Sequence, residues 1–334
     1  MMQIVSHERS IAFYLLLSFN RFAAMDEFQY LKNPMSKKWV VLAPRRAKRP
    51  DVAKGFEPVC PFCLGREKDE RELYRVGGQE GDKNWQIRVL PNKYPFAPIH
   101  EIIIHSPDHH KNFDELPLFQ VELIVKTYRQ RYLTHSEKGQ VFIFHNRGEA
   151  GGESLPHPHT QLAVVPFEVK MDIPRLDPNA SYGIAARPLS VTSSQEGLEQ
   201  QIATQTEFFY IFCPKTSGWP DEVWLAPKNR GRAFGEVTDG EVADLSYILN
   251  RLIRILDLRH GREFPFNFHI YPGGDWYLRL IPRLKTIGGF ELGSGIFVNT
   301  QDPVETIRFI KEHFEKPDED KILTEHQVTY QKTV

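Results

Sequence analysis

The chain has 334 residues, which is enough for two domains or for one duplicated domain. It is 41% hydrophobic and 25% charged, a composition typical of a globular protein. Its 42 Lys and Arg residues balance 43 Asp and Glu residues, so no overall charge excess favours nucleic acid or a membrane as a partner. An anionic substrate would have to be held by a local basic cluster.

The first 24 residues contain one apolar run, which extends from Ile11 to Phe19. The run is too short to span a membrane, and it resembles a weak signal peptide. We expect residues 1–24 to be a dispensable or mis-assigned segment, with Met25 or Met35 as the true start. We expect a cytoplasmic location, because the cysteine pair described below suits a reducing compartment.

Short β-branched or aromatic segments predict strands, at 39–42, 86–90, 101–105, 140–145 and 161–165. Apolar residues at helical spacing predict three helices. Asp114 is expected to cap the first helix, which ends near His135. Its inward-facing residues are expected to be Leu116, Phe119, Leu123 and Val125.

The second predicted helix is capped by Thr238 or Asp239 and ends at Gly261. Its apolar side consists of Val242, Leu245, Leu249, Leu252, Ile253 and Leu256. Asp302 and Pro303 begin the third helix, because proline suits the first helical position. The apolar side of that helix consists of Ile307, Phe309, Ile310 and Phe314.

Two stretches, 101–166 and 222–282, repeat one order of elements about 120 residues apart. Each contains a strand, a turn, a helix, a strand, a glycine-rich turn and a strand, and such self-similarity predicts a duplicated domain. We expect an α+β fold in which two related halves, 25–190 and 191–334, each have an antiparallel sheet and packed helices. In the second copy, Gly273 and Asp275 align with His157 and His159 of the first.

Two of the three cysteines form Cys60-Pro-Phe-Cys63, and three cysteines do not make a disulfide framework. A CxxC pair serves redox chemistry or binds a soft metal such as zinc, which requires two more ligands. Seven of the 13 histidines lie within residues 105–159, which favours the metal. The candidates for the remaining ligands are the histidines of Pro107-Asp-His-His110 and His157.

The segment His157-Pro-His159 follows a turn that contains Gly148, Gly151, Gly152 and Ser154. Alternation along an extended chain points both rings to the same side. One ring can bind a metal while the other, as a neutral imidazole, attacks phosphorus in a cleft. We expect N–H groups of the turn and the Gln161 amide to contact phosphate oxygens. A simple metal site is the alternative interpretation of the pair.

The cysteine pair and the histidine segment belong to a longer series of motifs along the chain. The motifs are Asn33-Pro-Met-Ser-Lys-Lys-Trp39, Pro44-Arg-Arg-Ala-Lys-Arg-Pro50, Cys60-Pro-Phe-Cys63, Pro91-Asn-Lys-Tyr-Pro-Phe96, Ser106-Pro-Asp-His109, Asn146-Arg-Gly148, His157-Pro-His-Thr-Gln161 and Gly289-Phe-Glu-Leu-Gly293. Together they resemble the galactose-1-phosphate uridylyltransferase family, a branch of the histidine-triad superfamily. The resemblance covers the chain from Asn33 to about Phe314 and implies a histidine-triad-like fold.

The resemblance implies a role for each matching residue. One structural zinc site falls on Cys60, Cys63, His109 and His157, with His110 as the alternative to His109. The implied nucleophile is His159, and Gln161 is the glutamine typical of transferases. The implied substrate-binding residues are Arg46, Arg49, Asn92, Phe144, Asn146, Ser154, Lys285 and Glu291. The two arginines belong to a basic run that supplies a local anion site, partly across the interface of an expected homodimer.

The chain also departs from the family pattern. Some members have a second metal site that uses a His-X-His pair, but here that stretch is Tyr277-Leu-Arg279 and only His269 remains. We therefore expect no second metal. Phe297 stands where the family has a glutamine that contacts the hexose. This change, with the run Gly289-Phe-Glu-Leu-Gly-Ser-Gly295, resembles the ADP-glucose phosphorylase branch.

The implied reaction is that of a UDP-glucose–hexose-1-phosphate uridylyltransferase of galactose metabolism. His159 would attack the α-phosphorus of a UDP-sugar, expel sugar 1-phosphate, and pass the uridylyl group to a second hexose 1-phosphate. One alternative is an ADP-sugar or dinucleoside polyphosphate phosphorylase that uses phosphate as acceptor. Another is a non-catalytic nucleotide-binding protein, against which the intact His159 and Gln161 argue.

Overall fold

The computed structural model describes residues 28–48, 59–176 and 201–324. Three of the expectations above concern positions outside these described residues. They are the N-terminal segment 1–24, the substrate-binding residue Arg49 and the division of the chain at residues 190 and 191.

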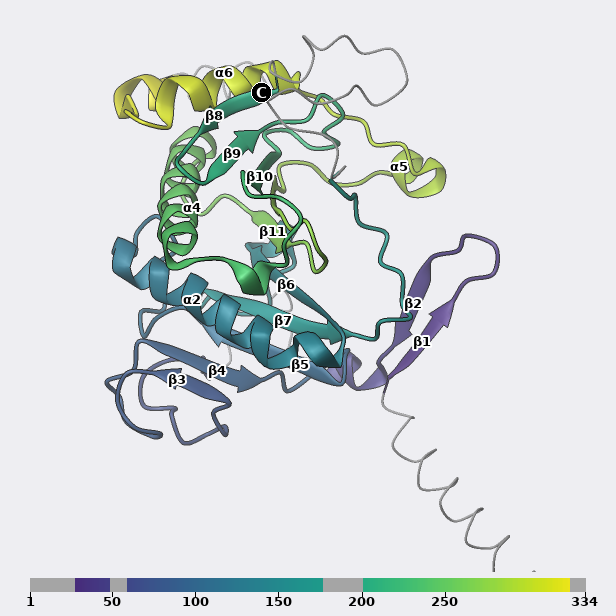
Figure 1. The fold of residues 1–334 in the computed structure, drawn as a ribbon, viewed down its shortest axis with the longest axis vertical. Helices are drawn as coiled ribbons and strands as arrows, with labels where there is room; N and C mark the ends of the chain where they lie inside the picture. Colours follow the sequence, from purple (N-terminus) through teal and green to yellow (C-terminus); the bar gives the residue numbers. More distant parts are fainter. Residues whose placement is uncertain (1–27, 49–58, 177–200, 325–334) are drawn as a thin grey trace, which may run out of the picture.

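Ten strands form one sheet, and two more form a separate hairpin (Figure 1). All neighbouring strands are antiparallel, in the order β3-β4-β5-β7-β6-β11-β12-β10-β9-β8. The bounds are Tyr74–Val76 for β3, Ile87–Pro91 for β4, Ile99–Ile104 for β5, Gln140–Arg147 for β6, His159–Val165 for β7, Ile202–Gln205 for β8, Phe209–Phe212 for β9, Val223–Pro227 for β10, Phe266–Ile270 for β11 and Leu278–Pro282 for β12. The hairpin consists of β1 (Gln29–Lys32) and β2 (Trp39–Leu42) and projects from the body.

The strand order is symmetrical about the pair formed by β6 and β11. Outward from that pair, β7, β5, β4 and β3 lie on one side, and β12, β10, β9 and β8 lie on the other. Helix α2 (Leu118–His135) precedes β6, and helix α4 (Asp239–His260) precedes β11. The predicted α+β fold with an antiparallel sheet and helices is confirmed, and the sheets of the two halves are one continuous sheet.

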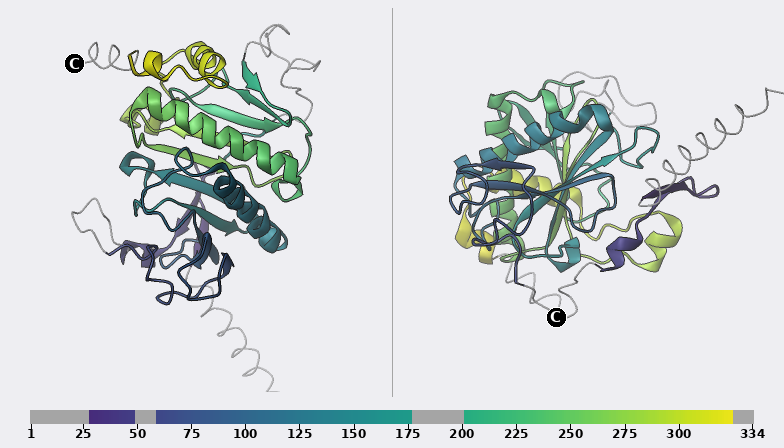
Figure 2. Two further views of the ribbon diagram at one scale, coloured as in Figure 1. Left: turned by 90° about the vertical axis from the view of Figure 1, so that its left-hand side faces the viewer. Right: turned by 90° about the horizontal axis from the view of Figure 1, so that it is seen from below.

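Helices α2 and α4 lie side by side on one face of the sheet (Figure 2). Helix α4 has the predicted ends: the Thr238 side chain accepts the N–H of Glu241 at 3.2 Å, and Gly261 at φ 91° ends the helix. The apolar side of α4 is buried as predicted. Helix α6 (Pro303–His313) also agrees, with Asp302 accepting the N–H of Val304 at 3.0 Å.

Helix α2 begins later than predicted, at Leu118. Pro117 immediately precedes it with an extended ψ of 144°, and a proline disfavours helical geometry in the residue before it. Asp114 is therefore not the cap and lies in a separate turn, where burial raises the pKa of its carboxyl to about 6. The predicted inward position of Phe119 is also wrong, because this side chain is 58% exposed.

The structure also contains several short helical segments. They are the 3₁₀ turns Pro44–Lys48, Ser136–Lys138, Glu149–Gly151 and Phe234–Glu236, and the six-residue helix α5 (Gly289–Ser294). Within the described ranges, no helix has the length and apolar character that crossing a membrane requires.

Strand β6 shows how the two faces of the sheet differ. Its residues alternate between buried and half-buried, as expected for a strand with one covered face. Val141, Ile143 and His145 are buried with the helices, whereas Phe142 and Phe144 are half-buried on the opposite face. The second face, which α2 and α4 do not cover, carries the candidate site.

Candidate functional site

Four of the predicted metal ligands come together beside the start of β7. The donor atoms of Cys60, Cys63, His109 and His157 all lie within 4.8 Å of one another. Nδ1 of His109 is 3.1 Å from Cys63 Sγ, and Nδ1 of His157 is 3.7 Å from both sulfur atoms. His110 is outside this cluster, so the structure selects His109 from the two adjacent histidines.

The donor set fits one zinc ion. Nε2 of His157 donates to the Ser106 carbonyl at 2.9 Å, which leaves Nδ1 with the lone pair facing the thiols. Burial lowers the pKa of His157 to about 4, so its ring is neutral. Burial raises the pKa of the Cys60 thiol to about 11, and a bound cation would stabilise the thiolate instead. Two sulfur and two nitrogen donors complete a tetrahedral structural site.

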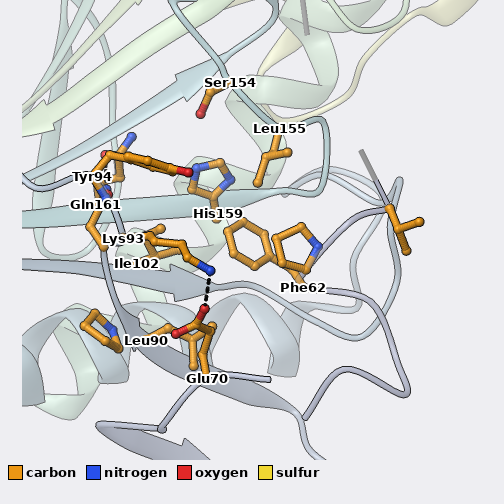
Figure 3. A pocket seen from close by; sticks show the side chains of 14 residues that line it. Phe62, Glu70, Leu90, Lys93, Tyr94, Ile102, Ser154, Leu155, His159 and Gln161 are labelled. Carbon is orange, nitrogen blue, oxygen red and sulfur yellow. Dashed lines mark hydrogen bonds and ion pairs between the residues drawn. The ribbon is translucent and has the colours of Figure 1, made fainter. Parts of the chain in front are cut away.

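A cavity of about 260 Å³ adjoins the cluster (Figure 3). Four predicted site residues line it: Asn92, Ser154, His159 and Gln161. The wall is completed by Val59, Pro61, Phe62, Glu70, Leu90, Pro91, Lys93, Tyr94, Ile102 and Leu155. Lys93 pairs with Glu70 at 2.8 Å, so this lysine already has a carboxylate partner.

His159 is the first residue of β7 and lines this cavity. Its Nδ1 donates to the His157 carbonyl at 2.8 Å, so in the neutral ring Nε2 carries the lone pair. Phe62 meets both histidine rings edge-on, with centroids 5.3 Å from His159 and 5.9 Å from His157. The shared contact is consistent with the expectation that the two rings point to the same side.

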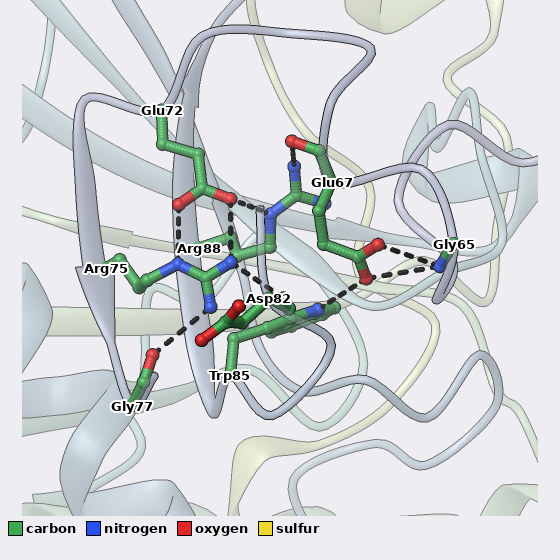
Figure 4. A network of polar contacts seen from close by, with 8 residues as sticks. All are labelled: Gly65, Glu67, Glu72, Arg75, Gly77, Asp82, Trp85 and Arg88. Carbon is green, nitrogen blue, oxygen red and sulfur yellow. Dashed lines mark hydrogen bonds and ion pairs between the residues drawn. The ribbon is translucent and has the colours of Figure 1, made fainter. Parts of the chain in front are cut away.

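The loop that carries the two cysteines is anchored by a buried polar network (Figure 4). Arg88 of β4 is fully buried and donates to Glu72 at 2.5 Å. The Trp85 indole donates to Glu67 at 3.0 Å, and its ring belongs to the apolar cluster that contains Phe62. Phe62, and with it the wall of the cavity next to His159, is therefore held by both apolar and polar contacts.

Strand β7 is also fixed from the helix-covered face. Nδ1 of His145 donates to the His159 carbonyl at 3.0 Å. Nε2 of His105 lies 2.8 Å from the hydroxyl oxygen of Thr160, which in turn contacts Tyr128 at 2.5 Å. Burial holds the pKa of both histidines well below the usual range, so their rings are neutral. These contacts fix the strand at His159 and Thr160.

Three further predicted residues lie close to the cavity without lining it. Phe144 stands directly opposite Gln161 in the β6–β7 pair. Oδ1 of Asn146 accepts from Asn267 of β11 at 2.9 Å, so the second half of the chain contacts this amide. Nη1 of Arg46 donates to the carbonyl of Tyr94, a lining residue, at 2.8 Å.

Lys285 and Glu291 are not among the residues that line the cavity. They pair with each other at 3.4 Å in the second half of the chain, and the Lys285 ammonium lies 5.3 Å from the ring centre of Trp219. Phe297 packs on the same tryptophan, with centroids 6.1 Å apart. Within the described residues, the structure does not bring these sugar-side positions to His159.

The glycine-rich turn before His157 uses its glycine N–H groups for hydrogen bonds within the turn itself. The N–H groups of Gly148, Gly151 and Gly152 all bond within the turn, at 2.8 to 3.0 Å, so the expectation that they contact phosphate is not supported. Gly148 has a φ of 72°, and a Cβ there would lie 2.9 Å from Cβ of Pro265. Only glycine fits that position.

Several lining residues were not predicted from the sequence. Phe62 lies between the two cysteines, and its buried partners come from distant segments. His100 of β5, which contacts the lining residue Gln161, was also missed. The one signal for it is a histidine in a strand rich in isoleucine, and this pattern alone does not distinguish a core histidine from a functional one.

Similarity to known proteins agrees with this geometry. Residues 98–166 match the family described as galactose-1-phosphate uridyl transferase, N-terminal domain. An ADP-glucose phosphorylase of Arabidopsis thaliana is 25% identical over 326 residues, which cover 84% of this chain and 92% of the relative. A galactose-1-phosphate uridylyltransferase of Thermotoga maritima is 27% identical over 318 residues, which cover 86% of this chain and 98% of the relative.

Solved structures share the fold. An ADP-glucose phosphorylase from Arabidopsis thaliana with bound ADP-glucose has a TM-score of 0.63 and 23% identity, covering 86% of this chain and 99% of that chain. A uridylyltransferase structure has a TM-score of 0.67 and 23% identity, covering 86% of this chain and 98% of that chain. The resemblance predicted from the motifs is confirmed: residues 98–166 match the galactose-1-phosphate uridyl transferase N-terminal domain family, and most of the chain is similar to relatives named for that activity or for ADP-glucose phosphorylase.

Proposed function

We propose that this chain is a nucleotidyltransferase that uses a nucleotide sugar as donor and carries the nucleotidyl group on His159. The observation that carries the proposal is the hydrogen bond from Nδ1 of His159 to the His157 carbonyl at 2.8 Å, at the wall of the cavity that Gln161 also lines. This bond fixes the ring so that the lone pair of Nε2 is available for attack on phosphorus.

In the first step Nε2 of His159 forms a bond to the α-phosphorus, and the bond from that phosphorus to the sugar 1-phosphate oxygen breaks. The ring keeps the proton on Nδ1 and becomes positively charged, and the His157 carbonyl stabilises this charge. In the second step an acceptor phosphate oxygen attacks the same phosphorus and releases the neutral ring. The Gln161 amide and the Ser154 hydroxyl are the proposed donors to the phosphoryl oxygens.

A zinc ion on the Cys60, Cys63, His109 and His157 donors would have a structural role in this reaction. Four protein ligands leave no coordination position for water or substrate. The ion would tie the cysteine loop to the backbone just before His159, and thereby fix the carbonyl that orients the nucleophile.

The first candidate for the full activity is UDP-glucose–hexose-1-phosphate uridylyl transfer. The family match over residues 98–166 and the Thermotoga maritima relative support it. Asn92, Phe144 and Asn146 are the proposed contacts to the nucleoside. Arg46 and Arg49 are proposed for the phosphates, and Lys285 and Glu291 for the sugar. Since the last two do not line this chain's cavity, their contact depends on the proposed homodimer.

The second candidate is phosphorolysis of an ADP-sugar, with inorganic phosphate as acceptor. It is supported by Phe297 at the position of the expected sugar-binding glutamine and by the Arabidopsis thaliana relative, which is 25% identical over 84% of this chain. The same histidine would serve both reactions, so the base of the donor and the identity of the acceptor separate them. A cytoplasmic location is proposed with either, because all three cysteines are free.

Donors labelled at the α-phosphate test the mechanism and the substrates together. Wild-type protein of measured zinc content is mixed separately with UDP-glucose and ADP-glucose, and acid-labile label on the protein is counted. The labelled protein is then chased with galactose 1-phosphate or with inorganic phosphate. We expect label from one donor and release by one acceptor, and no label on a His159→Gly variant. Zinc-containing protein that takes no label from either donor would instead be a non-catalytic nucleotide-binding protein.

A further inference from the structure

His100 contacts Gln161, a residue of the cavity wall, and does not itself line the cavity. It belongs to β5, is 4% exposed, and packs on the Phe96 ring with centroids 4.3 Å apart. In the β5–β7 pair, His100 lies opposite Ala163 and Ile102 lies opposite Gln161. His100 and Gln161 are thus diagonal neighbours on adjacent strands, on the face that carries the cavity.

The backbone fixes the tautomer of His100. The N–H of Phe96 donates to Nδ1 of His100 at 3.3 Å, so Nδ1 is an acceptor. Burial, with the charge of Arg46 nearby, lowers the pKa of His100 to about 4, and the ring is neutral at pH 7. The proton of a neutral ring must then be on Nε2. This N–H donates to Oε1 of Gln161 at 2.9 Å.

Asn92 supplies a second donor to the same oxygen. Its Oδ1 accepts the N–H of Tyr94 at 2.9 Å, which fixes the orientation of the amide. Its Nδ2 therefore faces Oε1 of Gln161, at 3.4 Å. This Nδ2 also lies 3.2 Å from Nε2 of His100, because the two donors converge on one acceptor. A flipped Gln161 amide would place its NH₂ group against two N–H donors.

We propose that His100 is a positioning residue that holds the Gln161 amide with its NH₂ group toward the cavity. The inference rests on the proposed function, in which that group donates to the phosphoryl oxygens as negative charge develops on them. Without the His100 donor, the amide can flip and present its carbonyl oxygen to those oxygens, which opposes the transition state. The loss should appear in the rate of transfer to His159 and hardly in donor binding.

Two substitutions of His100 separate its donor from its packing. His100→Phe keeps a ring against Phe96 and removes the donor, whereas His100→Gln keeps an N–H close to the position of Nε2. With saturating donor in a single turnover, we expect His100→Phe to slow labelling of His159 by about 10- to 100-fold, with little change in the donor dissociation constant. His100→Gln should restore most of the rate. His269→Phe, a change of a half-buried histidine on the same face of the sheet, is the matched control and should label at the wild-type rate.

A double-mutant cycle then tests whether His100 acts through Gln161. In a Gln161→Ala background the His100→Phe change should have no further effect on the labelling rate. An equal slowing in both backgrounds, or a wild-type rate for His100→Phe, would overturn the inference while leaving the covalent mechanism in place. Absence of label on the wild-type protein would overturn the proposed function and this inference together. Circular dichroism, melting temperature and zinc content identify any variant that has misfolded.

Discussion

The turns that precede β7 and β12 are counterparts in the two halves, and they differ in what their side chains do. In the first half, His157 lies in the metal cluster and His159 lines the cavity. In the second half, the sequence repeat aligns Asp275 with His159, but Asp275 lies in the turn before β12 with a φ of 64°. Its carboxylate forms an ion pair with Arg230. The same supersecondary frame can therefore hold a nucleophile or a purely structural ion pair.

The exposed faces of the two halves differ as well. The first half has the cavity beside β7, whereas the corresponding face of the second half is filled by its own apolar cluster. Leu176, Phe212, Trp224 and Tyr277 pack together there, and the Tyr277 hydroxyl donates to the Pro174 carbonyl at 2.5 Å. The segment that follows β7 thus covers the second half. Within the described residues, the second half thus has an aspartate in place of the nucleophile and an apolar cluster on the face where the first half has its cavity.

The largest expected difference between the halves concerns the nucleophile. His159→Ala should reduce nucleotidyl transfer by about 10⁴-fold and abolish the covalent label, because no other group in the cavity replaces the imidazole. Asp275→Ala should keep the label and most of the activity, since the carboxylate bonds only within the second half, to Arg230 and to the N–H of Gly231. Peptide mapping of labelled protein locates the adduct. Label on a peptide of the second half, or loss of label in Asp275→Ala, would contradict the assignment of the nucleophile to the first half.

Cysteine substitutions extend the comparison to metal binding. Cys63→Ser should lose zinc and lower the free energy of unfolding by more than the roughly 1 kcal/mol typical of a point change, because one metal bond links distant segments. Cys213→Ala, in the core of the second half, should retain zinc and cost only about 1 kcal/mol for a small cavity. Zinc content and urea denaturation measure both. Full zinc occupancy in Cys63→Ser would contradict the assignment.

Acid stability should depend on a histidine of the second half. Burial lowers the pKa of His269 to about 3, and the neutral ring stacks on Phe142 with centroids 5.5 Å apart. The unfolded chain takes up a proton near pH 6.5, so this residue's contribution to stability is present above that pH and is lost as the pH falls toward 3. The loss is about 2 kcal/mol between pH 7 and pH 5.

His269→Phe should remove this part of the pH dependence and leave transfer activity unchanged. Urea denaturation at pH 7 and pH 5 gives the free energies of unfolding, and the difference between the two should be smaller in the variant than in the wild type. An unchanged difference would show that His269 is protonated equally in the folded and unfolded chain.

The smallest expected effect is a contribution of the second half to the site of the first. Nδ2 of Asn267 donates to Oδ1 of Asn146 at 2.9 Å and to the Gly151 carbonyl at 2.7 Å. Asn267→Ala should raise the KM for the nucleotide donor by about 10-fold, the value of one hydrogen bond, with little change in kcat. Steady-state kinetics test this, with Asp275→Ala as the matched change in the same half. A wild-type KM would show that the second half does not contribute to binding of the nucleotide donor.

Features set by local chemistry could be predicted from the sequence. The ends of α4 are set by Thr238, Glu241 and Gly261, each of which acts on backbone close to it in the sequence. The two cysteines of the CxxC pair are likewise brought together by a single tight turn. The four donors of the metal cluster could be named because the family motif connects their distant segments. The sequence also indicated that the halves are related, since the repeat preserves the order of elements.

Features set by contacts between distant segments could not be predicted. The late start of α2 depends on Pro117 overriding a plausible cap at Asp114. The role of His100 depends on the register of β5 against β7 and on the N–H of Phe96, neither of which a residue pattern specifies. For the same reason, the positions of Lys285 and Glu291 away from the cavity could not be anticipated from their motif.

The pairing of β6 with β11 has a consequence for any attempt to divide the molecule. Its five residue pairs are the direct strand contact between the halves within the continuous sheet. A half expressed alone would expose a bare sheet edge, with unpaired N–H and C=O groups along a strand rich in aromatic residues. Such an edge recruits another strand, so isolated halves should self-associate or aggregate. Because both halves are parts of one chain, each edge always has the complementary edge at a high effective concentration, and the two edges pair with each other.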